Sequence, residues 1–272
     1  MPAWLMNGAG NAFLVIDVRG QAALAGMGGD QVRGLAARHG FDQFLIISDS
    51  DRGDAHMGVI NADGSPSGAC GNGARCVAWH VMEGLNTDRL VLDSDGGLME
   101  AERTGDWRVR VDLGPARTGW QDIPLAREMD TVSMDLSVEA GRDLRLSSPG
   151  AVSMGNPHCV FFVENAETVP ARAIGHRVEH DPLFPERVNV GFAQILDEAR
   201  IRLRVWERGA GLTLACGTGA AAALVAAARR GLTGRATAIL ADGGELQAVW
   251  RDDGHVTVEG PVALTGEIDW PA

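Results

Sequence analysis

Short runs of apolar residues, separated by glycine, aspartate and asparagine, recur along the whole chain. Turn signals such as those at 62–64 and 252–254 lie between the runs, so the pattern predicts short strands joined by tight turns. Longer runs predict helices at 31–38, 73–83 and 219–230, and the last is rich in alanine, a strong helix former. The predicted strands are 12–17, 44–48, 57–61, 89–93, 98–100, 107–112, 152, 160–163, 190–195, 201–206, 236–240, 246–250 and 255–260.

The same polar and cysteine positions occur twice along the chain, 145 or 146 residues apart. A repeat of this length is too long for a solenoid and predicts two similar domains that face each other, with polar residues of both in the cleft. A stretch containing glycine and proline at 114–124 is the expected boundary. The matching pairs are Gly10-Asn11 with Gly155-Asn156, Gln43 with Asn189, Asn61 with Glu207, and Ala69-Cys70-Gly71 with Ala215-Cys216-Gly217.

Each half carries a Cys-Gly-x-Gly-Ala segment directly before a predicted helix, at 70–74 and at 216–220. This spacing predicts both sulfurs at helix N-termini, where free N–H groups and the helix dipole favour a thiolate and depress the thiol pKa. The same N–H groups could also hold a substrate carboxylate. One such segment alone would more often be a buried cysteine in a turn, but its recurrence at matching positions favours a catalytic pair, Cys70 and Cys216.

Other kinds of site fit these residues less well. The segment 217–222 matches a dinucleotide-binding fingerprint, with Asp242 about 20 residues further on. However, only about 50 residues follow this segment, too few for the rest of a doubly wound sheet. Zinc is disfavoured because the chain has no C-x-x-C pair and the spacing of Cys70 and Cys76 is not usual for zinc ligands. We expect Cys76 and Cys159 in the core. A duplicated module that binds an amino acid without catalysis remains an alternative.

Several polar residues lie at or near the ends of predicted strands in both halves. Neutral amides can bind ammonium and carboxylate groups without adding charge beside a pair of thiols, and Arg208 can hold a carboxylate through two parallel hydrogen bonds. His158 could tune the pKa of a thiol or could be structural. The candidate amides are Asn11, Gln43, Asn61, Asn156 and Asn189.

Composition narrows the class of partner. The formal net charge is -12, from 36 acidic and 24 basic residues, which argues against nucleic acid or an anionic membrane as a partner and favours a small molecule. The N-terminal sequence lacks the features of a signal peptide and no apolar stretch reaches membrane-spanning length, so we expect a cytoplasmic protein. The sequence contains no lysine, which excludes a lysine Schiff base with pyridoxal phosphate.

Together these motifs resemble the diaminopimelate epimerase family, and the resemblance covers nearly the whole chain. Related racemases for proline and hydroxyproline share the duplicated fold, but typically carry Gly-His where this chain has Gly71-Asn72. The blocks that carry the resemblance lie at 6–11, 61–65, 69–76, 154–158 and 206–219.

The resemblance implies an α+β fold of two structurally similar domains, each a mostly antiparallel, β-barrel-like sheet around a central helix. It places the first domain at 1–116, with 263–272 returning to it, and the second at 117–262. It also implies an isomerase, an epimerase that interconverts LL- and meso-2,6-diaminopimelate for lysine and peptidoglycan precursor synthesis. We expect a homodimer without cofactor or metal.

The resemblance also assigns roles to residues. Cys70 and Cys216 would be the acid and base on opposite faces of Cα, since a single base would return the proton to the side it came from. His158 and Glu207 would adjust the thiol pKa values. The residues expected to bind the substrate are Asn11, Gln43, Asn61, Gly71, Asn72, Asn156, Asn189, Glu207, Arg208, Gly217 and Thr218.

Overall fold

The computed structural model describes residues 1–21, 28–68, 70–140 and 144–269. The chain divides into two compact units, Met1–Asp112 with Glu259–Ala272, and Leu113–Val258. The domain boundaries expected from the sequence, 1–116 with 263–272 and 117–262, stay a prediction. Ala69 of the repeated motif and residues 270–272 of the returning segment lie outside the described residues.

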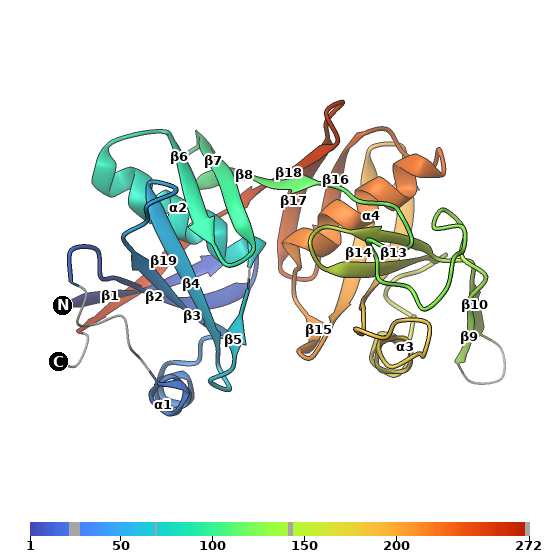
Figure 1. Ribbon diagram of the computed structural model, residues 1–272, viewed down its shortest axis with the longest axis horizontal. Coiled ribbons are helices and arrows are strands. Elements are labelled where there is room, and N and C mark those ends of the chain that lie inside the picture. The colour runs from blue at the N-terminus through green and yellow to red at the C-terminus, as the bar shows by residue number, and fades with distance from the viewer. Residues whose placement is uncertain (22–27, 69, 141–143, 270–272) are drawn as a thin grey trace. The chain divides into compact units, whose positions relative to one another are not determined.

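The first unit is a sheet in which antiparallel and parallel pairs combine (Figure 1). β1 pairs with β19 and β2, β3 pairs with β4, and β6 pairs with β7, all antiparallel, whereas β2–β3 and β4–β6 are parallel. The strands are β1 (Pro2–Gly8), β2 (Asn11–Asp17), β3 (Gln43–Ser48), β4 (Ala55–Asn61), β5 (Pro66–Ser67), β6 (Arg89–Ser94), β7 (Gly97–Gly105), β8 (Arg108–Pro115) and β19 (Ala263–Asp269). The helices are α1 (Gly29–His39) and α2 (Gly71–Leu85).

The second unit repeats this order of pairing. β11–β12, β13–β14 and β16–β17 are antiparallel, and β12–β13 and β14–β16 are parallel. The strands are β9 (Ser137–Ala140), β10 (Leu144–Ser147), β11 (Gly150–Ser153), β12 (Pro157–Phe162), β13 (Asn189–Asp197), β14 (Arg200–Glu207), β15 (Gly211–Thr213), β16 (Ala236–Ala241), β17 (Gly244–Trp250) and β18 (His255–Pro261). The helices are α3 (Ala171–Glu179) and α4 (Gly217–Arg229).

Strand register confirms the duplication read from the sequence. Val59 of β4 pairs with Ser67 of β5, and Val205 of β14 pairs with Thr213 of β15. Both residues of the second pair lie 146 positions after those of the first, the same interval that separates Cys70 from Cys216. The α+β fold of two similar units is therefore as predicted.

One helix lies at the centre of each unit. α2 contacts β1, β2, β3, β4, β6 and β7, and α4 contacts β11, β12, β13, β14, β16 and β17, so each sheet curves round its helix (Figure 1). The run from Gly219 to Ala227 of α4 is buried on all sides, which small alanine side chains permit because they let strands approach closely. The predicted helices 73–83 and 219–230 are confirmed, and each begins two residues earlier than expected.

Helix α3 was not predicted from the sequence. A glycine at position 175 obscures its pattern, but Ala171, Ile174 and Val178 recur at helical spacing and are buried, and this spacing could have revealed it. The predicted strand 107–112 begins one residue late, because Trp107 adopts a left-handed φ of 55° in the turn before β8.

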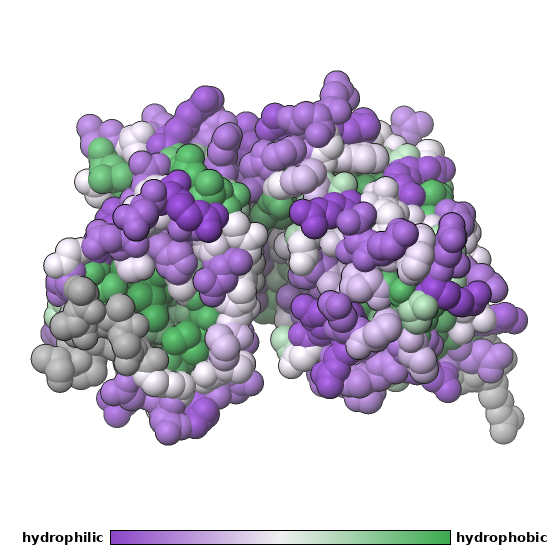
Figure 2. All heavy atoms as spheres, viewed as in Figure 1, coloured by the Kyte–Doolittle hydropathy of each residue, from purple (hydrophilic) through white to green (hydrophobic). Residues whose placement is uncertain are grey.

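The surface drawn in Figure 2 is mainly polar, with apolar residues in separate patches. This agrees with the acidic composition of the chain. Among the described residues, no helix is both long enough and apolar enough to cross a membrane.

Candidate functional site

Cys70 stands at the N-terminus of α2, as the sequence predicted. Its backbone is extended, with φ -146°, and its sulfur accepts a hydrogen bond of 3.2 Å from the N–H of Gly73. An added Cβ on Gly73 would lie 3.1 Å from a methyl carbon of Leu45, so glycine lets the first turn pack closely under the sulfur. Cys70 is partly exposed and free of any disulfide.

Cys216 has the same arrangement at the start of α4. Its backbone is extended, with φ -133°, and its sulfur accepts from the N–H of Gly219 at 3.4 Å. An added Cβ on Gly219 would lie 3.1 Å from Val205 and 3.3 Å from the sulfur. Both cysteines therefore place their sulfurs against the free N–H groups of a helix start.

The residue two positions after each cysteine is hydrogen-bonded to an asparagine at or just before the start of a strand in the same unit. The Asn72 amide donates to Oδ1 of Asn11 at 2.5 Å, and the Asn156 amide donates to the Thr218 hydroxyl at 3.3 Å. These bonds join residues 61 and 62 positions apart, so the tertiary fold holds one helix start against the beginning of β2 and the other against the residue just before β12.

The Cys216 thiol has a raised pKa. Burial is the largest cause, and the Glu207 carboxylate adds to it, while bonds from Thr218 and the Gly219 N–H act in the opposite direction. The pKa lies well above the usual value for cysteine. The expectation of a depressed pKa was therefore wrong for Cys216, because desolvation and a neighbouring anion outweigh the helix terminus.

His158 lies in the same network. Its Nε2 lies 3.1 Å from both Oδ1 of Asn156 and the hydroxyl of Thr218, and Thr218 lies 3.5 Å from the Cys216 sulfur. Burial, followed by the positive charge of Arg208, lowers the pKa of His158 to about 3. The imidazole is therefore neutral near pH 7, and it reaches the sulfur through Thr218.

Arg75 is a buried residue near the first cysteine that the sequence analysis did not single out. Its side chain is 1% exposed and donates to Oδ1 of Asn72 at 2.9 Å. Its Nε has no hydrogen-bond partner in the part of the chain that the structure describes. Burial lowers the pKa of Arg75 to about 10, so it keeps its charge at neutral pH. The matching position in the second unit is Ala221.

The remaining polar candidates of the first unit meet across two strands. Gln43 of β3 pairs in register with Asn61 of β4, and its amide donates to Oδ1 of Asn61 at 2.9 Å. Asn61 in turn donates to the Ser65 hydroxyl at 3.0 Å, which links it to the turn that follows β4.

Asn189, Glu207 and Arg208 form the corresponding group in the second unit. The buried Asn189 side chain donates to the carbonyl of Pro157 at 3.0 Å and accepts from the N–H of Arg208 at 2.9 Å. Glu207 accepts from the Thr213 hydroxyl at 2.6 Å. The Arg208 side chain is exposed, and one of its N–H groups donates to the carbonyl of Glu186 at 2.9 Å.

The other two cysteines are buried in the core, as expected. Both are fully buried and free, and burial raises the pKa of Cys76 to about 12 and raises the pKa of Cys159 as well. A buried thiol of this kind is inert near neutral pH.

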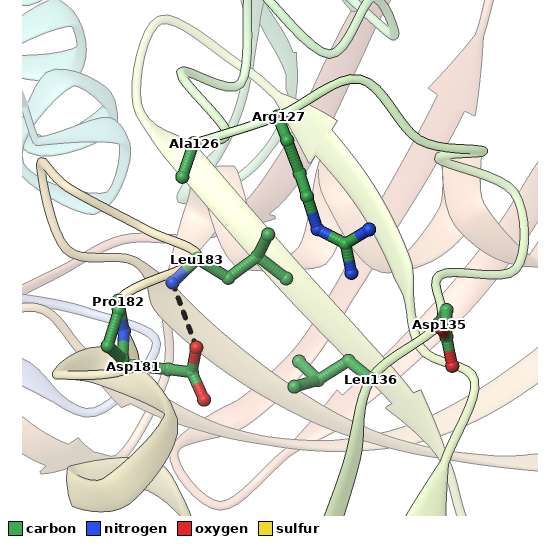
Figure 3. Close-up of a pocket in the computed structure, with 7 residues that line it drawn as sticks. All are labelled: Ala126, Arg127, Asp135, Leu136, Asp181, Pro182 and Leu183. Carbon is green, nitrogen blue, oxygen red and sulfur yellow. Dashed lines mark hydrogen bonds between the residues drawn. The ribbon is translucent and has the colours of Figure 1, made fainter.

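Figure 3 shows a pocket of about 340 Å³ in the second unit that contains none of the residues predicted from the sequence. The side chain of Arg127 extends toward Leu136 and Leu183, and Asp135 lies to one side (Figure 3). It is lined by Ala126, Arg127, Asp135, Leu136, Asp181, Pro182 and Leu183.

Comparison with known proteins identifies the family of the whole chain. The family model "Diaminopimelate epimerase" matches residues 3–119 and 150–265. The chain belongs to the diaminopimelate epimerase family. A diaminopimelate epimerase of Phenylobacterium zucineum is 50% identical over 273 residues, covering 99% of this chain and 98% of the relative. One of Acidiphilium cryptum is 49% identical, covering 98% and 96%.

Solved structures share the fold at much lower sequence identity. A predicted epimerase from Pseudomonas aeruginosa superposes with a TM-score of 0.70 at 16% identity, covering 100% of this chain and 99% of the other. A hydroxyproline epimerase from Agrobacterium vitis superposes with a TM-score of 0.65 at 15% identity, covering 98% and 91%. These structures establish the two-unit fold independently of close sequence similarity.

Proposed function

We propose that this protein interconverts LL- and meso-2,6-diaminopimelate, with Cys70 and Cys216 exchanging the proton at Cα without a cofactor. The observation that most directly supports this proposal is that each cysteine caps the central helix of its unit, and each sulfur accepts a hydrogen bond from the N–H three residues later in the chain. Family membership supports the substrate and the reaction.

The chemistry requires two groups because the proton leaves one face of Cα and returns to the other. Each sulfur must reach Cα from its own side, within about 3 to 3.5 Å. The carbanion that forms next to the carboxylate needs stabilisation, which the N–H groups at the helix starts Gly71-Asn72 and Gly217-Thr218 supply in this proposal.

The two cysteines start in different protonation states in this proposal. Cys216, with its raised pKa, is the thiol that delivers a proton. A two-base exchange needs one thiolate at the outset, and Cys70, the more exposed of the pair, takes that role. The reverse direction begins after the two have exchanged protonation states.

The end of the substrate away from the reaction needs its own binding groups. Arg208 offers N–H groups that can hold a carboxylate in parallel, and Asn61, Asn156 and Asn189 offer neutral donors and acceptors. Gln43 braces Asn61, and Asn11 braces Asn72 at the start of α2, through the hydrogen bonds described above.

The proposal is tested by NMR of LL- and meso-diaminopimelate in D2O with the purified protein. We expect inversion at one Cα together with entry of solvent deuterium there. A protein that binds the amino acid but exchanges no Cα proton would be a binding module, and this result would refute the proposal. Binding of a nicotinamide dinucleotide in calorimetry would favour a dehydrogenase.

The family resemblance also leads us to propose a homodimer in the cytoplasm. Light scattering of the purified chain tests the first part, and cell fractionation tests the second. A monomer across the working concentration range would contradict the dimer.

A further inference from the structure

The turn that carries Arg208 is held by two buried side chains at successive backbone N–H groups. Asn189 accepts from the N–H of Arg208 at 2.9 Å, and Glu179 accepts from the N–H of Gly209 at 3.0 Å. Gly209 has a φ of 76°, a left-handed conformation that suits glycine and turns the chain back toward β15. The backbone on both sides of the Arg208 Cα is therefore fixed.

Glu179 is unusual for its burial. It is the last residue of α3 and is 2% exposed. Its second oxygen accepts from Nε1 of Trp206 at 2.7 Å, and the exposed Arg187 lies 3.6 Å from the first. Burying a carboxylate costs free energy unless donors surround it, and the N–H groups of Trp206 and Gly209 provide these donors.

α3 also fixes Trp206, the residue two positions before Arg208. An added Cβ on Gly175 would lie 2.4 Å from Cγ of Trp206, so the ring packs directly on the helix backbone. The ring of His176 contacts it edge-on, with centroids 6.2 Å apart. One helix thus holds the strand end before Arg208 and the turn after it.

The first unit has a similar contact between a helix and a turn at equivalent positions. Arg33 of α1, 146 residues before Glu179, donates to the carbonyl of Asp63 at 2.9 Å, and Asp63 lies 146 residues before Gly209. An added Cβ on Gly29, the equivalent of Gly175, would lie 2.5 Å from the carbonyl oxygen of Gly64. In the first unit α1 is therefore hydrogen-bonded to the turn after β4, and in the second unit α3 is hydrogen-bonded to the turn after β14. The helix side chain is the donor in the first unit and the acceptor in the second.

We propose that Glu179 is a positioning residue that sets the place of the Arg208 guanidinium through Trp206 and the Gly209 N–H. Glu179 makes no contact with substrate in this proposal. The inference rests on the proposed function, because Arg208 is taken to bind the distal end of the amino acid. Interactions at an end remote from the reacting carbon contribute to ground state and transition state alike, so their loss raises KM more than it lowers kcat.

The test uses Glu179→Gln in the full chain, assayed with LL-diaminopimelate. The glutamine amide keeps one acceptor but turns an N–H group toward either the Trp206 or the Gly209 donor. We expect KM to rise about tenfold, with kcat within about threefold of the wild type. Glu167→Gln removes an exposed carboxylate that also pairs with an arginine, Arg202, and should leave both constants unchanged.

A second variant separates positioning from simple destabilisation. Trp206→Phe keeps a ring against Gly175 and removes the indole N–H. In the double variant, which combines Glu179→Gln with Trp206→Phe, the glutamine therefore no longer faces that donor. We expect the double variant to have a lower KM than Glu179→Gln alone. If the two substitutions raise KM additively, so that the double variant has a higher KM than Glu179→Gln alone, the proposal is overturned.

The outcomes also separate this proposal from the proposed function. A wild-type protein that does not epimerise diaminopimelate would refute the proposed function. An active wild type with an unchanged KM in Glu179→Gln would refute the role of Glu179 alone. If Glu179→Gln does not fold, Trp206→Phe decides: a KM equal to that of the wild type would refute the role, and a rise of several-fold with kcat retained would support it.

Discussion

The close contact between Gly175 and Trp206 makes a sharp prediction for Gly175→Ala. Alanine in a helix interior is ordinarily favoured over glycine by about 1 kcal/mol. Here the new Cβ would meet three atoms of Trp206 at 2.4, 2.5 and 2.8 Å, well inside ordinary contact distance. Trp206 is 8% exposed and is held by Glu179, so it has little room to move.

The overpacking cost therefore outweighs the gain in helix propensity. Forcing extra atoms into a packed core costs about 1 to 3 kcal/mol. Because the new Cβ would make three close contacts with a side chain that is held in place, we expect a cost at the upper end of this range. We expect a net loss of about 2 kcal/mol in the free energy of unfolding. This corresponds to a fall in Tm of about 4 to 8 °C for a chain of this size.

Gly34→Ala is the matched control. Gly34 lies inside α1, and an added Cβ there would meet no atom within 4 Å. The same chemical change should then stabilise by about 0.4 to 1 kcal/mol, because only helix propensity and chain entropy act. Urea unfolding followed by circular dichroism measures both. If Gly175→Ala proves as stable as the wild type, Trp206 is not fixed against α3 as described.

Three further predictions concern the thiols and His158. Cys70→Ala and Cys216→Ala should each lower kcat/KM by about 10² to 10⁴, and full turnover in either variant would contradict the two-cysteine mechanism. Iodoacetamide at pH 8, followed by mass spectrometry, should label Cys70 before the buried Cys76 and Cys159, whose pKa values are raised; equal labelling would contradict their burial. The lowered pKa of His158 makes the unfolded chain bind an extra proton below pH 6.5, so stability should fall by about 2 kcal/mol from pH 7 to 5. In urea unfolding His158→Gln should lose less, and an equal loss in both proteins would contradict this assignment.

The surroundings of the two cysteines could be predicted because they depend on local sequence. A cysteine followed by Gly-x-Gly-Ala before a helix determines both the cap and the sulfur–N–H bond, and both are present at Cys70 and Cys216. The duplication could be predicted from spacing alone, because matching polar and cysteine positions recur at one interval along the chain. The lack of lysine decides against a Schiff base without any coordinates.

Other features depend on residues far apart in the chain. Glu179 meets Gly209 across 30 positions, and nothing local marks a glutamate at the end of a short, glycine-containing helix as buried. The pKa of Cys216 also reversed the sequence-based expectation. A helix start favours a thiolate wherever it occurs, but burial and the approach of Glu207 depend on how the strands pack.

The sequence by itself determined the two-fold repeat, the central helices and the position of each sulfur, because these follow from hydrophobic spacing and helix-capping chemistry. Only the tertiary structure decided the protonation state of Cys216, the burial of Arg75 beside Asn72, and the tie between α3 and the Arg208 turn. Desolvation and long-range hydrogen bonds are properties of the packed chain, so local sequence carries little information about them.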